Sequence, residues 1–291
     1  MRRLRLLAGF ALLLAASPAL AHESGDSGTG WTLSPLVIVP LALAALVYAA
    51  GLARVWARSG QGRKALKRDA ALFAAGWLTL AGALTSPLHE AGETSFTMHM
   101  IEHEIVMLVS ALLLVAARPG PVLLWAFPAG FRRPLGSVGR WAVWRVLADP
   151  FVATFLQGAV IVVWHIPRLF DLALAGEAWH VAQHLSFVGG ALIFWWAMLH
   201  GRSGPLVSAA CLFVTAMIGG GLGGLMALSG SPWYQGYAAL GLTPSGLTPE
   251  QDQQLAGLIM WVPGGAWHLA AALWFLMRAL RNMEARHALP R

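Results

Sequence analysis

The stretch Met98-His99-Met100-Ile101-Glu102-His103-Glu104 decides the fold and the function that we expect for this sequence. An almost purely apolar run, residues 105–117, follows it directly. The two histidines of the stretch are four residues apart, so they lie on the same face of a helix. An apolar helix does not need polar groups at its entrance in order to be buried. We therefore expect residues 96–117 to form a membrane-spanning helix that carries a polar site at one end.

The composition indicates a helical membrane protein. Of the 291 residues, 57% are hydrophobic and only 11% are charged, less than half of the roughly 25% that is typical of soluble domains. Several apolar runs have about 20 residues, the length at which a helix crosses a bilayer. The net charge of +7 does not indicate binding to nucleic acid, because the basic residues fall between the apolar runs. The single cysteine, Cys211, excludes a disulfide framework.

The pattern of apolar runs predicts an all-α, polytopic fold with about seven transmembrane helices. The expected spans are residues 33–53, 70–87, 96–117, 151–166, 179–199, 205–228 and 255–276. Residues 1–21 have the basic start, apolar core and Ala-Leu-Ala end of a secretory signal peptide, with an uncleaved first span as the alternative. The other divisions are a polar outer tail at 22–32, a seven-helix membrane domain at 33–278 and a cytoplasmic tail at 279–291.

The basic residues predict the orientation of these spans. Sixteen of the 20 Lys and Arg residues fall on one set of alternate loops and the C-terminal tail, whereas the other loops hold only Arg168. The positive-inside rule then predicts an outer N-terminus and a cytoplasmic C-terminus. We expect a multi-pass protein of a bacterial-type cell (inner) membrane, in contact with the lipid bilayer.

Histidines gather near the outer face under this topology. The second pair at a spacing of four stands at the mouth of the fifth span, and one further histidine ends the fourth span. A lone interfacial histidine is usually a hydrogen-bonded structural residue, but two such pairs with a histidine on the intervening span favour a site for a metal or a cofactor. The candidate ligands are His99, His103, His165, His180 and His184. We assign no catalytic residue and expect a binding protein rather than an enzyme.

Sulfur and carboxylate side chains beside the histidines indicate which metal would bind. Thioethers are soft ligands that select Cu(I), so Met98 and Met100 favour copper, with plain packing as the alternative. Glu102 is a candidate for fixing the tautomer of a histidine. Asp171 and Asp252 could do the same, or they could simply cap helices.

Two local patterns in the last two spans predict how their helices begin and pack. The run of glycines at 219–224 contains small residues four apart, which let helix backbones approach closely. Thr248, Pro249 and Gln251 have the order of a capping box with proline at the first helical position. We therefore expect a tightly packed sixth span and a helix start at Thr248.

Six short motifs follow one another along residues 70–270. They are Ser86-Pro87-Leu88; Met98-His99-Met100 with His103; Trp164-His165-Ile166-Pro167 with Asp171; His180-x-x-x-His184-x-x-Phe187; Phe194-Trp195-Trp196; and Asp252-Gln253 with Met260-Trp261. In this order and spacing, the motifs resemble the polytopic CtaG (Caa-type CtaG) family of cytochrome c oxidase assembly factors. An unrelated single-span assembly protein of the same name uses paired cysteines, which this chain does not have.

The resemblance implies a membrane factor that matures a haem–copper terminal oxidase by handling copper. It also implies that the five candidate histidines are the positions of the metal site, at the outer face of the membrane. The implied partners are a subunit of the oxidase and a protein that donates copper.

Three other functions remain open from the sequence. Paired histidines could ligate haem in a membrane redox protein, although a second layer of histidines near the inner face is missing and His200 is alone there. A zinc hydrolase would place its glutamate directly after the first histidine, whereas Glu102 directly precedes the second. A metal transporter would find its best support in the glycine run of the sixth span and in His268, near the middle of the seventh.

Overall fold

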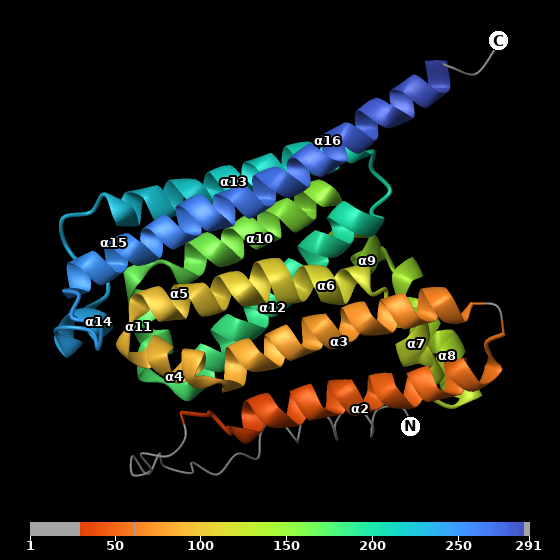
Figure 1. Ribbon diagram of the computed structural model, residues 1–291, viewed down its shortest axis with the longest axis horizontal. Coiled ribbons are helices and arrows are strands. Elements are labelled where there is room, and N and C mark those ends of the chain that lie inside the picture. Colours follow the sequence, from red (N-terminus) through yellow and green to blue (C-terminus); the bar gives the residue numbers. More distant parts are fainter. Residues whose placement is uncertain (1–29, 61, 288–291) are drawn as a thin grey trace. The chain divides into compact units, whose positions relative to one another are not determined.

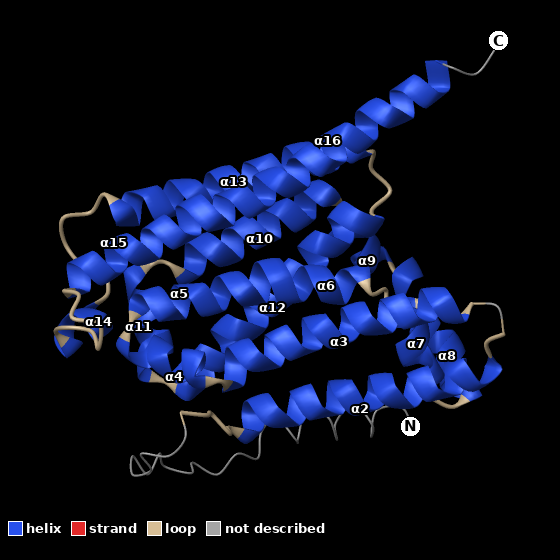
Figure 2. Ribbon diagram, in the orientation of Figure 1, coloured by secondary structure: helices blue, strands red, loops and turns tan. Residues whose placement is uncertain are grey.

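A computed structural model describes residues 30–60 and 62–287 of the chain, and all regular structure within them is helical (Figures 1 and 2). The predicted signal peptide at 1–21 and most of the predicted outer tail lie outside the described residues.

Five helical units in the described part of the chain are long and apolar enough to cross a membrane. They are α2 (Pro35–Arg58), Phe96–Ala116, α12 (Glu177–His200), α13 (Pro205–Ala227) and Pro249–Ala285. Two further units are bent pairs: α3 (Arg63–Thr85) with α4 (Pro87–Thr94), and α10 (Pro150–Trp164) with α11 (Pro167–Ala175). If each bent pair is one span, the described residues form up to seven spans, and each overlaps one predicted span.

Two of the long units contain a π-helical turn. The first consists of α5 (Phe96–Glu104), the π-helix η1 (Ile105–Ser110) and α6 (Ala111–Ala116). The other consists of α15 (Pro249–Ile259), the π-helix η3 (Met260–Gly264) and α16 (Gly265–His287). Pro263 lies inside η3 and has no amide hydrogen to donate, which disrupts the regular α-helical ladder there.

Prolines explain the two bent pairs. Pro87 and Pro167 each stand at the first position of the second helix of a pair. The residue before a proline is forced out of the α-helical region, so the preceding helix must end. The chain turns by 42° between α3 and α4, and by 73° between α10 and α11. These bends place α4 and α11 across the ends of the long helices (Figure 1).

The segment after the third span differs from the expected loop. It forms α7 (Gly120–Trp125), α8 (Ala129–Gly136), the 3-10 turn η2 (Val138–Arg140) and α9 (Ala142–Leu147). The loop between the sixth and seventh spans also contains a short helix, α14 (Gln235–Leu240). Their short apolar patterns lack the length of a span, which is why hydropathy alone did not indicate them.

The predicted capping box is confirmed at the start of α15. Thr248 accepts a hydrogen bond from the backbone N–H of Gln251, and the Gln251 side chain accepts one from the backbone N–H of Thr248. Pro249 occupies the first turn. The local sequence thus fixes where the last span begins.

The glycines of α13 allow close helix packing, as expected. A Cβ atom on Gly223 would lie 2.6 Å from the carbonyl oxygen of Gly257, and one on Gly257 would lie 2.5 Å from that of Gly223. Gly220 and Gly224 face the indole ring of Trp261 in the same interface. The backbones of α13 and α15 can approach this closely only because both contact residues are glycine.

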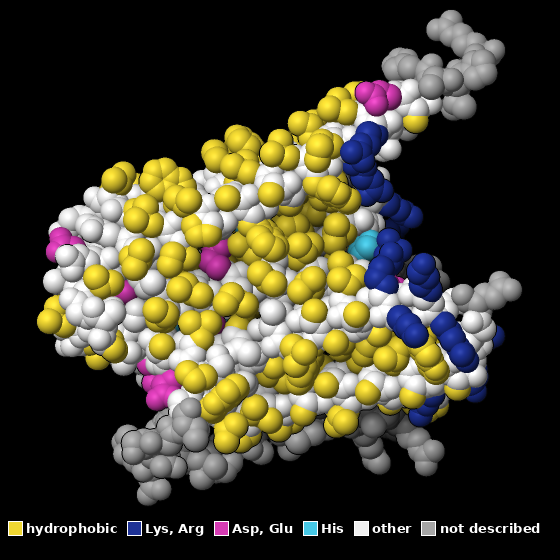
Figure 3. Space-filling model, viewed as in Figure 1, with side chains coloured by type: hydrophobic (Ala, Val, Ile, Leu, Met, Phe, Trp, Pro, Cys, Tyr) yellow, Lys and Arg dark blue, Asp and Glu magenta, His cyan; other side chains and the backbone are white. Residues whose placement is uncertain are grey.

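The surface agrees with a protein that sits in a membrane. Hydrophobic side chains cover the middle of the molecule, and Lys and Arg side chains gather at one end (Figure 3). That end contains the link between α2 and α3 and the short helices α7 to α9 (Figure 1). The helices α4 and α11 and the start of α5 lie at the other end.

Candidate metal centre

Three helices bring histidines to the end of the molecule opposite the basic residues. The bend after α3 lets α4 pack against α5, which places His89 beside the first turns of α5. His99 and His103 belong to α5, and His180 and His184 belong to the first turns of α12. Spans far apart in the sequence therefore contribute to one cluster.

The two predicted histidine pairs meet. The ring centroids of His99 and His180 are 5.6 Å apart, and those of His103 and His184 are 5.0 Å apart. Within the pairs, the centroids are 4.2 Å apart for His99 and His103 and 4.6 Å apart for His180 and His184. His89 adds a fifth ring, 5.2 Å from that of His180. We call these five residues the His cluster.

Ligand atoms within the His cluster converge. The Nε2 atoms of His180 and His184 are 2.8 Å apart, so one of them must carry a proton for the contact to be attractive. A metal ion in place of that proton would find a lone pair on each nitrogen. One ligand atom from each of His89, His180 and His184 lies within 4.8 Å of the other two. This spacing suits ligands that share one ion.

Glu102 contacts two members of the His cluster. Its side chain is fully buried, and its Oε1 atom accepts a hydrogen bond from Nδ1 of His89 at 2.9 Å. The same oxygen lies 3.6 Å from Nδ1 of His184. A carboxylate at Nδ1 directs the proton to that nitrogen and leaves Nε2 as the ligand atom. The carboxylate therefore has the position expected for a group that orients the ligands.

Burial makes the unpaired nitrogens of the cluster informative. His99 is 2% exposed and His103 is fully buried. Among the described residues, the following enclosed ring atoms have no hydrogen-bond partner: Nε2 of His99, both nitrogens of His103 and Nδ1 of His184. Buried polar atoms are nearly always paired in proteins, because leaving one unpaired is costly. Imidazole nitrogens left in this state fit a site that holds Cu, Zn, Fe or Ni.

His165 lies beside the cluster at the break between α10 and α11. Its Nδ1 atom donates to the carbonyl oxygen of Ile161 at 2.7 Å, which fixes the tautomer. Its Nε2 atom is enclosed and has no hydrogen-bond partner among the described residues. The ring of Phe170 has its centroid 6.1 Å from that of His165 and 5.3 Å from that of His99, so it packs near both histidines.

The two predicted aspartates accept hydrogen bonds at the starts of helices rather than from histidines. Asp252 is buried and accepts hydrogen bonds from Ser95 Oγ and from the N–H groups of Phe96 and Thr97, so it anchors the start of α5. Asp171 accepts from the first two N–H groups of α14. Both residues therefore cap helices, which was one of the two roles considered for them.

The two predicted methionines differ in their surroundings. Met100 is fully buried within the main hydrophobic core, among residues that include Phe96. Met98 is half-buried. The position of Met100 agrees with plain packing, the alternative considered for it.

His89 is the cluster residue that sequence reasoning missed. The predicted spans at 70–87 and 96–117 leave His89 in the short link between them. The signal that could have found it is Ser86-Pro87: the Ser86 side chain accepts from the N–H of Leu88, and Pro87 takes the first helical position. Those two residues begin a new helix and turn His89 toward α5.

Comparison with known proteins identifies the family of the chain. Residues 46–282 match the family described as cytochrome c oxidase caa3 assembly factor (Caa3_CtaG). The chain is also 27% identical over 193 residues to uncharacterized protein Mb0105 of Mycobacterium bovis and to uncharacterized protein MT0111 of Mycobacterium tuberculosis. These matches cover 61% of this chain and 27% of each relative, so the chain spans about a quarter of their length. No solved structure matches the chain. The family match covers most of the chain and all of the His cluster, and the chain therefore belongs to the family of cytochrome c oxidase caa3 assembly factors.

Proposed function

We propose that this protein binds copper at the His cluster and delivers it to a subunit of a haem–copper oxidase during assembly. The observation that carries the proposal is the meeting of two histidine pairs from separate spans, with enclosed nitrogens that have no hydrogen-bond partner among the described residues. Family membership supplies the partner, a haem–copper oxidase in a membrane. Copper is the cargo in this proposal, and the protein has no catalytic role.

The donor set supports exchangeable binding. Neutral imidazoles bind copper ions well, and a site with several imidazoles can pass its ligands to an incoming protein one at a time. His89 and His180 are only partly buried, whereas His99 and His103 are enclosed. An ion could therefore be reached by a copper donor or an oxidase subunit from the side of His89 and His180.

The distribution of charge supports an outer position for the His cluster. Lys and Arg side chains gather at the far end of the molecule (Figure 3), and the positive-inside rule favours a cytoplasmic position for such an end. The His cluster then faces the outer side, and the C-terminus is cytoplasmic. Copper would be handled on the outer side of a bacterial-type cell membrane.

The haem alternative has less support from the geometry. Each of the five rings packs against at least two others, with neighbouring centroids as close as 4.2 Å, so the cluster suits a small ion better than the wide porphyrin ring. His200, near the basic end, is hydrogen-bonded to the carbonyl oxygen of Val115.

The experiment is copper loading of detergent-purified protein, followed by metal analysis and a visible spectrum. The test variant carries His99→Ala, His103→Ala, His180→Ala and His184→Ala, and the control carries His200→Ala. Copper retained by the wild type and the control but lost by the test variant supports the proposal. Equal copper in all three proteins contradicts it, and a Soret band would assign the cluster to haem. In cells, the test variant should leave the oxidase copper-deficient, whereas the control should restore its copper.

A further inference from the structure

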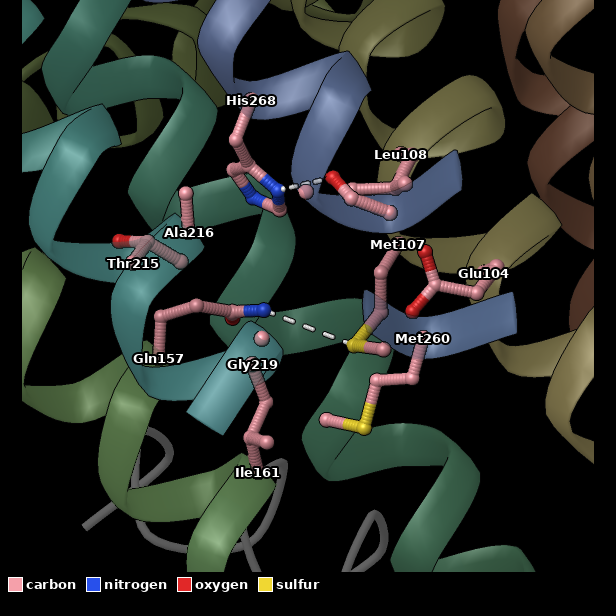
Figure 4. A pocket seen from close by; sticks show the side chains of 13 residues that line it. Glu104, Met107, Leu108, Gln157, Ile161, Thr215, Ala216, Gly219, Met260 and His268 are labelled. Atoms are coloured by element: carbon pink, nitrogen blue, oxygen red, sulfur yellow. Dashed lines mark hydrogen bonds between the residues drawn. The ribbon is translucent and has the colours of Figure 1, made fainter. Parts of the chain in front are cut away.

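A second polar site lies deeper in the helix bundle. A small cavity, with about 20 Å³ open to the centre of a water molecule, is lined by residues of α5, η1, α10, α13, η3 and α16 (Figure 4). That volume holds one water molecule or one ion. No member of the His cluster lines it. The side chains that line it with oxygen, nitrogen or sulfur atoms include Glu104, Met107, Gln157, Met260 and His268.

Both π-helical turns of the described chain line this cavity. Met107 belongs to η1, and Met260 belongs to η3. Figure 4 shows their thioether groups turned toward the same space as the carboxyl group of Glu104. Single π-helical turns are rare and are often found at functional sites. The indole N–H of Trp195 donates to the carbonyl oxygen of Met107 at 2.9 Å, which satisfies a backbone acceptor within η1.

The imidazole of His268 has one ring nitrogen with a lone pair that can bind a metal. Its Nδ1 atom donates to the carbonyl oxygen of Gly264 at 2.9 Å, so the proton is on Nδ1 and Nε2 carries a lone pair. The indole ring of Trp195 stacks on this imidazole at an interplanar angle of 11°, with the centroids 6.2 Å apart. The ring is therefore held in place by a hydrogen bond on one atom and by stacking on one face.

Two polar side chains at the cavity have unmet hydrogen-bonding capacity. The Oε2 atom of Glu104 is enclosed without a partner among the described residues, and it lies where a Cβ atom on Gly264 would be 2.6 Å away. Gln157 is 3% exposed, and its Oε1 atom likewise has no partner in the described chain. Its Nε2 atom lies 3.5 Å from the sulfur of Met107. A carboxyl group buried in an apolar span is either protonated or lies beside a cation, so Glu104 can take up the charge of a bound ion by giving up its proton.

We propose that this cavity is a second Cu(I) site, in which Met107, Met260 and His268 hold the ion and Glu104 balances its charge. Thioethers are soft ligands that prefer Cu(I) to Zn, Mg or Ca, and imidazole completes a set suited to copper. The identity of the ion rests on the proposed function, whereas the donor set is independent of it.

The location gives the second site a role distinct from that of the His cluster. Met107 follows His103 by four residues on one continuous span, roughly 6 Å further along the helix. The cavity therefore lies next to the His cluster on its membrane side. A reduced copper ion would be stored there, away from the partly exposed His89 and His180.

The experiment measures Cu(I) bound to detergent-purified full-length protein kept anaerobic with ascorbate, in competition with bicinchoninate. X-ray absorption at the copper edge then reports whether sulfur is a ligand. The variant Met107→Leu with Met260→Leu preserves volume, and Met217→Leu, at a side chain that is 52% exposed, is the matched control. We expect the double variant to lose about one Cu(I) ion per chain together with the sulfur signal. The control should lose neither.

The result that overturns the second site is a wild-type spectrum without sulfur, or a sulfur signal that the double variant retains. The four-histidine variant of the His cluster separates this failure from failure of the proposed function. If that variant loses nitrogen-bound copper while the double methionine variant behaves as wild type, copper handling stands and the second site fails. If it loses no copper and the double variant loses the sulfur-bound ion, the second site stands and the His cluster does not bind copper. Thermal unfolding of each variant confirms that the comparison is made between folded proteins.

Discussion

Oε1 of Glu102 lies 2.9 Å from Nδ1 of His89, and this contact joins the short helix α4 to the span that begins with α5. The same oxygen is 3.6 Å from Nδ1 of His184 on α12. One buried carboxylate thus reaches histidines from two other helices. It explains how imidazoles from α4 and α12 can present Nε2 atoms toward a common point.

Glu102→Gln removes the charge of this carboxylate while keeping its size. We expect copper affinity to fall about 10- to 100-fold, the usual cost of losing a partner that orients a metal-binding histidine. Isothermal titration or competition with a chelator measures the change. Glu250→Gln, at a half-buried position in the first turn of α15, should leave the affinity unchanged. Equal affinities for Glu102→Gln and wild type would show that the carboxylate does not orient the ligands.

His89→Ala tests the histidine that the structure adds to the cluster. Its ligand atom lies within 4.8 Å of those of His180 and His184, so its removal should lower copper affinity at least as much as His165→Ala does. His165 has one ring nitrogen committed to the carbonyl oxygen of Ile161 and contributes at most one ligand atom. Titration of both alanine variants with copper under the same conditions shows which of them loses more affinity. A larger loss of copper affinity for His165→Ala than for His89→Ala would indicate that the ion lies nearer to α10 than to α4.

Most of the fold could be predicted because span length and hydropathy depend on local sequence alone. The positions of His99, His103, His180 and His184 also followed from local spacing, since residues four apart share a helix face. Their meeting could be inferred only from chemistry and orientation. The structure supplies the ring distances that confirm it.

The parts that could not be predicted depend on contacts between distant residues. Asp252 is separated by more than 150 residues from the helix start that it caps, and no pattern near Asp252 indicates that contact. His89 enters the cluster only because a proline ends α3 and α4 bends back. The cavity at Met107 and Met260 depends on two π-helical turns, which hydropathy does not reveal.

Asp252→Ala should destabilise the protein, because Ser95 Oγ and the N–H groups of Phe96 and Thr97 would lose their shared buried acceptor. We expect a loss of about 1.5–3 kcal/mol in the free energy of unfolding, the range for hydrogen bonds to a charged group. Thermal or denaturant unfolding in detergent measures it. Glu250→Ala, at a half-buried position in the same first turn of α15, is the control and should cost less than about 0.5 kcal/mol. Similar losses for the two variants would contradict the anchoring role.

Gly223→Ala tests the close approach of α13 and α15. A Cβ atom there would be 2.6 Å from the carbonyl oxygen of Gly257 and 2.9 Å from the backbone nitrogen of Trp261, and neither backbone atom can move independently. We expect a destabilisation of about 1–3 kcal/mol, the usual cost of overpacking. Gly221→Ala is the matched control, because a Cβ atom there meets nothing within 4 Å. Its stability should equal or exceed that of the wild type, since alanine favours helix more than glycine does. Equal unfolding temperatures for Gly223→Ala and Gly221→Ala would exclude a tight interface.

Tyr237→Phe should change the pH dependence of stability. The Tyr237 hydroxyl donates to the carbonyl oxygen of Gly92 at 2.6 Å, which fastens α14 to α4. Burial, assisted by the negative charge of Asp252, raises the pKa of Tyr237 well above its ordinary value in the folded protein. Below about pH 10 the phenol is protonated in the folded and the unfolded states, and the variant should be less stable by about 1 kcal/mol for the lost hydrogen bond. Above about pH 10 the unfolded phenol ionises while the buried one stays neutral, so the wild type loses stability as the pH rises.

The stability advantage of the wild type over Tyr237→Phe should therefore fall by up to about 1.4 kcal/mol for each pH unit above 10, and it should change sign within about one unit. Thermal unfolding of both proteins in detergent, across neutral and alkaline pH, gives the two curves. Other tyrosines ionise equally in both proteins, so their effect cancels in the difference. Parallel curves through alkaline pH would mean that the phenol ionises in the folded protein as readily as in water, and that α14 does not enclose it in solution.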